Sequence, residues 1–358
     1  MKHWLETRQV LDAVAACVSR GHRGALATVV RVNGSAYRHE GAKLFVAEDG
    51  SHVGNVSGGC LELDVRELAA EVIATGVAER RSWCGSIDPV EAWDLGVGCE
   101  GEVEITIDPM DSSCTAELAL LSDDAPFVLI SRRDGSAARL ALSARRSSGT
   151  LGDAGLDASA RRAFDGWIAD GRPGLRLLDG VECFVDVLLP PPRLVVCSAG
   201  DDAAVLANLA ADVGFSVIVA DRREAYLDPA RFRSIVRLVA SRPESLAEQV
   251  PLDARSYAVV MTHNFADDLA HLRGLLATTV PYIGMLGPRQ RTDRMLAQLR
   301  QEGAVDASRV FGPVGLDIGT DGAEQVALSV IAEVLAMRSG RDAVSLRARR
   351  APIHGGEG

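Results

Sequence analysis

The feature that most constrains the fold of this chain is an alternation of strand-like and helix-like segments after residue 192. Runs of apolar, often β-branched residues typical of buried strands occupy residues 193–197, 216–221, 257–262 and 282–286. A helical pattern follows the first of these runs and ends at residue 211. Further helical patterns cover residues 266–278, 288–302 and 321–338. Strands that alternate with helices predict βαβ units, so we expect a Rossmann-like, doubly wound parallel sheet over residues 193–340.

The glycine-rich turn that binds phosphates in many Rossmann domains is altered in this sequence. Its frame reads Ser198-x-Gly200-x-x-Ala203, and Asp201 and Asp202 would repel a pyrophosphate. Asp221 nevertheless occupies the place of an acid that binds a ribose. Two interpretations stay open, NAD(P) binding through Gly200 and Asp221 or a Rossmann domain that binds another ligand or none. The altered turn favours the second.

A second constraint lies in residues 55–64, where a strand pattern runs into two glycines, a cysteine and a helical pattern. The loop Ser57-Gly58-Gly59-Cys60 therefore sits where a helix begins, and the first backbone N–H groups of a helix have no partner within it. Those groups and the helix dipole favour a bound oxyanion or the thiolate of Cys60. Packing of a small residue is the structural alternative for Cys60.

Two neighbouring loops complete the candidate site. Residues 34–43 form a polar, cationic, glycine-bounded loop in which Arg38 could bind a phosphate, whereas His39 and Lys43 are expected to be hydrated. A second glycine-flanked cysteine, Cys99, could also approach a ligand closely. His263 follows a Rossmann strand, at the sheet edge where ligands of such domains collect.

The remaining segments suggest a division into domains. Residues 1–110 read as a mixed α/β domain, and residues 111–190 as an intervening α/β segment that ends in a proline-rich linker. The Rossmann-like domain over 193–340 follows, and residues 341–358 are expected to form a flexible tail.

Composition excludes several classes of protein. The formal net charge of −11 argues against nucleic-acid binding, and no apolar run is long enough for a transmembrane helix. The first residues lack the pattern of a signal peptide, so we expect a cytoplasmic protein without a membrane partner. The seven cysteines form no Cys-x-x-Cys pair, which predicts reduced thiols and no zinc site.

Several motifs in order resemble those of the XdhC/CoxI family. The N-terminal part carries Gly34-Ser35-x-x-Arg38-x-x-Gly41-Ala42, Val56-Ser57-Gly58-Gly59-Cys60-x-Glu62 and Gly98-Cys99-x-Gly101. The C-terminal part carries Thr262-His263, Tyr282-Ile283-Gly284 and Pro313-Val314-Gly315-Leu316-Asp317-Ile318-Gly319. The match covers both ends of the chain, roughly residues 10–110 and 193–340.

The resemblance implies an accessory protein that matures xanthine dehydrogenase and related molybdenum hydroxylases. Such a protein would bind molybdenum cofactor (molybdopterin), protect it while its sulfurated form is made, and deliver it to the hydroxylase apoenzyme. It would be a homodimer, would meet a cysteine desulfurase, and would catalyse little itself. Cys60, Cys99 and Arg38 would contact the cofactor, together with the Rossmann strand ends near His263.

Departures from the family pattern keep other functions open. The usual Gly-Ala-Gly-His turn is Ser198-Ala199-Gly200-Asp201, Asn264-Phe265 follows Thr262-His263, and the usual Gly-Cys-Gly-Gly is Gly98-Cys99-Glu100-Gly101. One alternative is a stand-alone NAD(P)- or nucleotide-dependent oxidoreductase that uses the Rossmann domain. Another is a docking scaffold that holds no cofactor.

Overall fold

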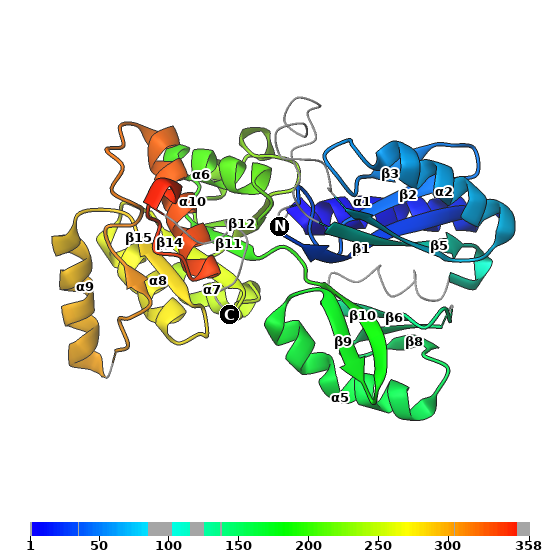
Figure 1. Ribbon diagram of the computed structural model, residues 1–358. Coiled ribbons are helices and arrows are strands. Elements are labelled where there is room, and N and C mark those ends of the chain that lie inside the picture. Colours follow the sequence, from blue (N-terminus) through cyan, green and yellow to red (C-terminus); the bar gives the residue numbers. More distant parts are fainter. Residues whose placement is uncertain are drawn as a thin grey trace. The chain divides into compact units, whose positions relative to one another are not determined.

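A computed structural model of the chain describes residues 2–34, 36–84, 102–114, 125–136, 138–303 and 305–348 (Figure 1). It consists of two compact units, the first spanning Lys2–Pro190 and the second beginning at Pro191. The predicted fold class is confirmed, since an N-terminal mixed α/β part precedes a Rossmann-like parallel sheet. The described residues of both the predicted 1–110 domain and the predicted 111–190 segment lie in the first unit.

The first unit contains two five-stranded antiparallel sheets, of which the first has the strand order β3-β2-β1-β5-β4. Its elements are α1 (Lys2–Ser19), β1 (Gly24–Asn33), β2 (Lys43–Ala47), β3 (His52–Gly54), α2 (Glu62–Thr75), β4 (Glu79–Cys84) and β5 (Glu102–Met110). Helix α2 packs on one face, where Val65 and Val72 meet Val29 and Ile105. Helix α1 packs on side chains of the opposite face.

The second sheet has the strand order β8-β7-β6-β10-β9. After a 3₁₀ turn at Ser112–Cys114, its elements are β6 (Phe127–Arg132), β7 (Arg139–Ser143), β8 (Ser147–Thr150), α5 (Ala154–Asp170), β9 (Gly174–Leu178) and β10 (Val181–Leu188). Helix α5 covers one face through Leu156, Phe164 and Trp167. The sequence pattern indicates β6 and β10, whereas the short strands between them and α5 carry no clear periodic signal.

A buried ion pair joins the two sheets of the first unit. Lys43 Nζ on β2 lies 2.5 Å from Asp186 Oδ2 on β10, and the two side chains are 1% and 2% exposed. The same ammonium donates to the carbonyl oxygen of Gly41 at 3.1 Å. The expectation that Lys43 is a hydrated loop residue is therefore wrong, because Lys43 is the first residue of β2 and its side chain is buried against the other sheet.

The second unit is a six-stranded parallel sheet with the order β13-β12-β11-β14-β15-β16. Its strands are β11 (Arg193–Cys197), β12 (Ser216–Asp221), β13 (Arg237–Ala240), β14 (Ser256–Val260), β15 (Tyr282–Met285) and β16 (Val310–Phe311). Its helices are α6 (Asp201–Asp212), α7 (Leu246–Gln249), α8 (Phe265–Leu276), α9 (Arg289–Glu302) and α10 (Ala323–Ser339). Short 3₁₀ turns occur at Glu224–Tyr226, Pro229–Arg231, Pro243–Ser245 and Leu346–Ala348.

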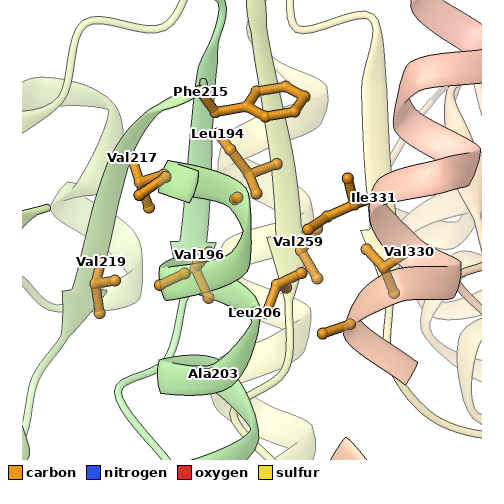
Figure 2. Close-up of a cluster of buried hydrophobic side chains, with 14 of the residues drawn as sticks. Leu194, Val196, Ala203, Leu206, Phe215, Val217, Val219, Val259, Val330 and Ile331 are labelled. Atoms are coloured by element: carbon orange, nitrogen blue, oxygen red, sulfur yellow. The ribbon is translucent and has the colours of Figure 1, made fainter. Parts of the chain in front are cut away.

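Two apolar cores lie on opposite faces of this sheet. Helices α6 and α10 bury one face, and Figure 2 shows Leu206 of α6, Val259 of β14 and Val330 of α10 in the same cluster. Helices α8 and α9 bury the other face. Because strand order reverses between β11 and β14, a crevice for ligands is expected at their carboxyl ends. Among the described residues, no helix is long and apolar enough to cross a membrane.

Candidate functional site

The loop Ser57-Gly58-Gly59-Cys60 is held by hydrogen bonds between Ser57 and Glu62 of α2. The backbone N–H of Ser57 donates to Glu62 Oε1 at 2.9 Å, and Ser57 Oγ donates to Glu62 Oε2 at 2.5 Å. Ser57 Oγ in turn accepts from the backbone N–H groups of Gly59 and Leu61, at 3.0 and 3.1 Å. Ser57 is buried and satisfies two backbone N–H groups of the loop that precedes α2.

The same loop presents a thiol to solvent. Cys60 is exposed, and Gly59 before it has a φ of 118°, which side chains rarely allow. A Cβ on Gly58 would lie 3.4 Å from Cγ of Tyr37, so the ring of Tyr37 lies over this glycine. Tyr37 itself is 68% exposed. The arrangement is an accessible sulfur on a fixed backbone, beside an aromatic ring.

The charge at this loop is negative. Burial raises the pKa of Glu62, but the hydrogen bonds donated by Ser57 outweigh it and hold the pKa below its usual value. Glu62 and Asp64 are both in the first turn of α2. The two carboxylates oppose a free anion here, so the chemistry of the loop rests on its sulfur more than on its helix dipole.

Arg38 is engaged by a carboxylate of α1. Its Nη2 lies 2.7 Å from Oε2 of Glu6, and its side chain is 19% exposed. A phosphate would have to share this guanidinium with Glu6 or displace that residue. Cys99 and Ser35 lie outside the described residues.

In the Rossmann unit, the turn that contains Gly200 is hydrogen-bonded to Asp221 through Ala199. Gly200 directly precedes α6, and its N–H donates to Ser198 Oγ at 3.1 Å. The carboxylate of Asp221, buried at the end of β12, accepts from the backbone N–H of Ala199 at 2.8 Å. Arg223 donates to both oxygens of the same carboxylate, at 3.0 and 2.8 Å.

These contacts change the meaning of Asp221. Burial raises its pKa, but the hydrogen bonds from Arg223 and Ala199 outweigh burial and lower the pKa overall. The carboxylate therefore stays charged, and both of its oxygens already accept hydrogen bonds from protein groups, so a ribose hydroxyl would have to compete with them. Together with Asp201 and Asp202 in the first turn of α6, this disfavours NAD(P) in the usual Rossmann mode.

His263 lies at the same sheet edge, between β14 and α8. It is exposed, its φ is 61°, and its Nε2 is 3.6 Å from Asp202 Oδ2. Gly200, Asp221 and His263 are thus brought to the carboxyl ends of β11, β12 and β14, as the spacing predicts. No group of three or more residues able to hold a metal ion occurs in the described ranges.

Two residues that the sequence does not single out belong to these sites. Tyr37 lies over Gly58. Its place in the sequence, four residues before Gly41, does not indicate that contact. His271 on α8 is 3% exposed, lines a polar pocket beside Asp221 and Thr262, and has no hydrogen-bond partner at Nδ1. Only a structure could place either of them.

Comparison with known proteins identifies the family. Residues 194–334 match the family described as the XdhC Rossmann domain, and residues 17–83 match the XdhC and CoxI family. A protein of Bacillus subtilis named as a probable xanthine dehydrogenase subunit is 32% identical over 87% of this chain and 92% of its own length. The chain belongs to the XdhC and CoxI family.

Two further proteins match this chain over similar lengths. The molybdenum cofactor insertion chaperone PaoD of Escherichia coli is 26% identical, over 92% of this chain and 88% of PaoD. The crystal structure of a xanthine dehydrogenase from Bacillus halodurans matches with a TM-score of 0.75 and 26% identity, over 95% of this chain and 98% of that one. The relationship therefore includes both units.

Proposed function

We propose that this protein binds molybdenum cofactor and delivers it to the apoenzyme of a xanthine dehydrogenase-type molybdenum hydroxylase. Two relatives over nearly the whole chain support the proposal, one named for xanthine dehydrogenase and one for insertion of this cofactor. The observation that carries it is the exposed thiol of Cys60 on a loop fixed by Ser57 and Glu62.

The residues of the loop fit the cofactor. Molybdenum cofactor supplies a soft metal that favours sulfur ligands, an aromatic-like pterin and a phosphate. Cys60 offers sulfur, and Gly59 before it has open space where a side chain would lie. Glu62 holds the loop in place before a ligand arrives, which lowers the entropic cost of binding.

The negative first turn of α2 shapes what this loop would hold. With Glu62 and Asp64 close by, the loop is suited to the sulfur-seeking end of a ligand rather than to its phosphate. Arg38 is the cation of the neighbouring loop, and release from Glu6 would free it for a phosphate. Contact with a cysteine desulfurase during sulfuration, and a homodimer as the working form, are parts of the same proposal.

Retention of the cofactor tests the proposal. Purified full-length protein is mixed with molybdenum cofactor released from a molybdoenzyme and gel-filtered, and molybdenum and pterin per chain are measured. We expect the wild type to retain both, Cys60→Ala to retain much less, and Cys17→Ala to match the wild type. Cys17 is a suitable control because it is a half-buried thiol whose Sγ lies 3.6 Å from the carbonyl oxygen of Arg23, away from the loop.

Each result has a definite meaning. A wild type that retains no cofactor contradicts cofactor binding, and equal retention by Cys60→Ala removes Cys60 from the site. Delivery is measured separately, as activation of a cofactor-free hydroxylase. The loaded protein should activate it faster than free cofactor does, and equal rates would argue against delivery.

A further inference from the structure

A cavity of about 290 Å³ opens at the carboxyl ends of β14 and β15, between α6 and α10. Leu206, Val259 and Val330, seen together in Figure 2, belong to its walls, as do Met261 and Val314. Its rim carries the carboxylate of Asp202 and the first residues of α10. The cavity is thus an apolar slot with one acidic side chain at its mouth, at the edge where Rossmann domains bind ligands.

The apolar walls determine the kind of group that fits. Two of the lining side chains are almost fully buried, with Val259 1% and Val330 2% exposed. Water in such an apolar space makes few hydrogen bonds, so binding of a flat ring that displaces the water is favourable. Phosphates are opposed by Asp201 and Asp202, which both lie in the first turn of α6. The cavity is therefore suited to the ring of a ligand and not to its phosphates.

Asp202 adds a requirement for hydrogen-bond donors. Its side chain is half-exposed, and Oδ2 lies 3.6 Å from Nε2 of His263, which positions the carboxylate at the rim. A carboxylate accepts two parallel N–H bonds best from a group with two adjacent donors. The 2-amino group and N3–H of a pterin are such a pair, whereas the corresponding edge of adenine offers one donor beside one acceptor.

We propose that this cavity binds the pterin ring of molybdenum cofactor, with Asp202 accepting hydrogen bonds from its 2-amino group and N3–H. The proposal rests on the function proposed above, since that function supplies the pterin. Asp202 acts as the specificity-determining residue, and the α6–α10 slot provides the apolar surface for the ring. The altered glycine turn agrees with this assignment. The usual turn binds phosphates, whereas Asp202 in this turn would accept hydrogen bonds from N–H donors.

Fluorescence titration of the full-length chain with free pterin tests the assignment. Lumazine, which carries oxygen in place of the 2-amino group, is the matched ligand, and adenosine is the competitor. We expect pterin to bind about tenfold or more tightly than lumazine, as loss of a charge-assisted hydrogen bond implies. Asp202→Asn should weaken pterin binding by about tenfold or more and reduce its advantage over lumazine.

Two further variants separate the cavity from general effects of charge and folding. Asp201→Asn removes the adjacent carboxylate, which pairs with Arg231 and does not line the cavity, so pterin affinity should not change. Ala323→Leu adds volume at the half-exposed mouth and should weaken pterin and lumazine alike. Unchanged affinity in both Asp202→Asn and Ala323→Leu overturns the proposal, and so does tighter binding of adenosine than of pterin.

The two proposals can fail separately. If the wild type retains molybdenum cofactor and both cavity variants retain it equally well, the pterin site is wrong while the proposed function stands. If the wild type retains no cofactor, the proposed function fails, and pterin binding that depends on Asp202 would assign the cavity to another pterin. Absence of pterin binding in a chain that retains cofactor overturns the ring site alone.

Discussion

At the scale of single residues, the candidate sites differ in how far their side chains are already bonded to other groups of the protein. Ser57 and Glu62 satisfy each other, and Arg38 is paired with Glu6. Cys60 and Asp202 keep groups that a ligand can reach. Residues of the first kind shape a site, and residues of the second kind contact what it binds.

The buried imidazole of His271 makes the free energy of unfolding of the Rossmann unit depend on pH. Burial lowers the pKa of this imidazole from 6.5 to about 4, against the opposing influence of Asp268, Asp267, Glu244 and Asp221. The unfolded chain therefore binds a proton between about pH 6.5 and 4 that the folded chain does not. Stability from this residue is present above pH 6.5 and is lost as the pH falls toward 4.

We expect His271→Leu to remove this part of the pH dependence. Urea unfolding at pH 7 and pH 4.5 should show a loss of free energy of unfolding in the wild type that exceeds the loss in His271→Leu by roughly 2–3 kcal/mol. His263→Asn, which alters an exposed imidazole at a left-handed position that asparagine accepts, should keep the wild-type difference. Equal pH dependence of the wild type and His271→Leu would contradict the assignment.

At the scale of elements, the Lys43–Asp186 pair is a buried polar contact between the two sheets of the first unit. Oδ1 of Asp186 is buried without a partner, so the pair is incompletely satisfied. We expect Lys43→Met to lower the free energy of unfolding by about 3–5 kcal/mol, because it leaves a buried carboxylate alone. Lys43→Met with Asp186→Leu should regain most of that loss, since neither charge of the pair is then left buried without its partner.

Chemical denaturation of the three chains measures this coupling. The exposed pair Arg176–Asp170, with 3.0 Å between Nη2 and Oδ2, is the matched control, and Arg176→Met should change stability little. If the double variant is no more stable than Lys43→Met, the unpaired carboxylate is not the cause of the lost stability, and this explanation is contradicted.

Sequence patterns predicted elements where periodicity is strong. The alternation after residue 192 predicts β11, β12, β14 and β15 and the helices α6, α8, α9 and α10 within a few residues, because buried parallel strands are nearly all apolar. Strand β13 and the short helix α7 are not among the predicted segments. The strands β7, β8 and β9 were not predicted, because short antiparallel strands with exposed faces, such as Ser147–Thr150, have little apolar periodicity.

The candidate sites show the limit of the same approach. Spacing alone placed Gly200, Asp221 and His263 at one sheet edge and Cys60 beside a helix start. It could not give the partners that decide their chemistry, such as Arg223 on Asp221 or Glu6 on Arg38. Those contacts join residues through the tertiary fold and through rotamers, which no local pattern specifies.

At the scale of the whole molecule, the boundary at Pro190 and Pro191 separates two units with cores of their own. Both apolar clusters of the Rossmann unit consist of residues after Pro191, and the walls of its cavity also lie within this unit. Folding and ring binding by this unit should therefore not depend on the first unit.

A fragment of residues 191–348 tests this independence. We expect it to unfold in urea as one cooperative transition and to bind free pterin with the affinity of the full chain. A fragment that stops at residue 320 lacks α10, which contributes Ala327, Val330 and Ile331 to the core beside α6. It should neither unfold cooperatively nor bind pterin, since one face of the sheet and one wall of the cavity would be missing. If the 191–348 fragment folds but binds pterin much more weakly than the full chain, part of the ring site belongs to the first unit.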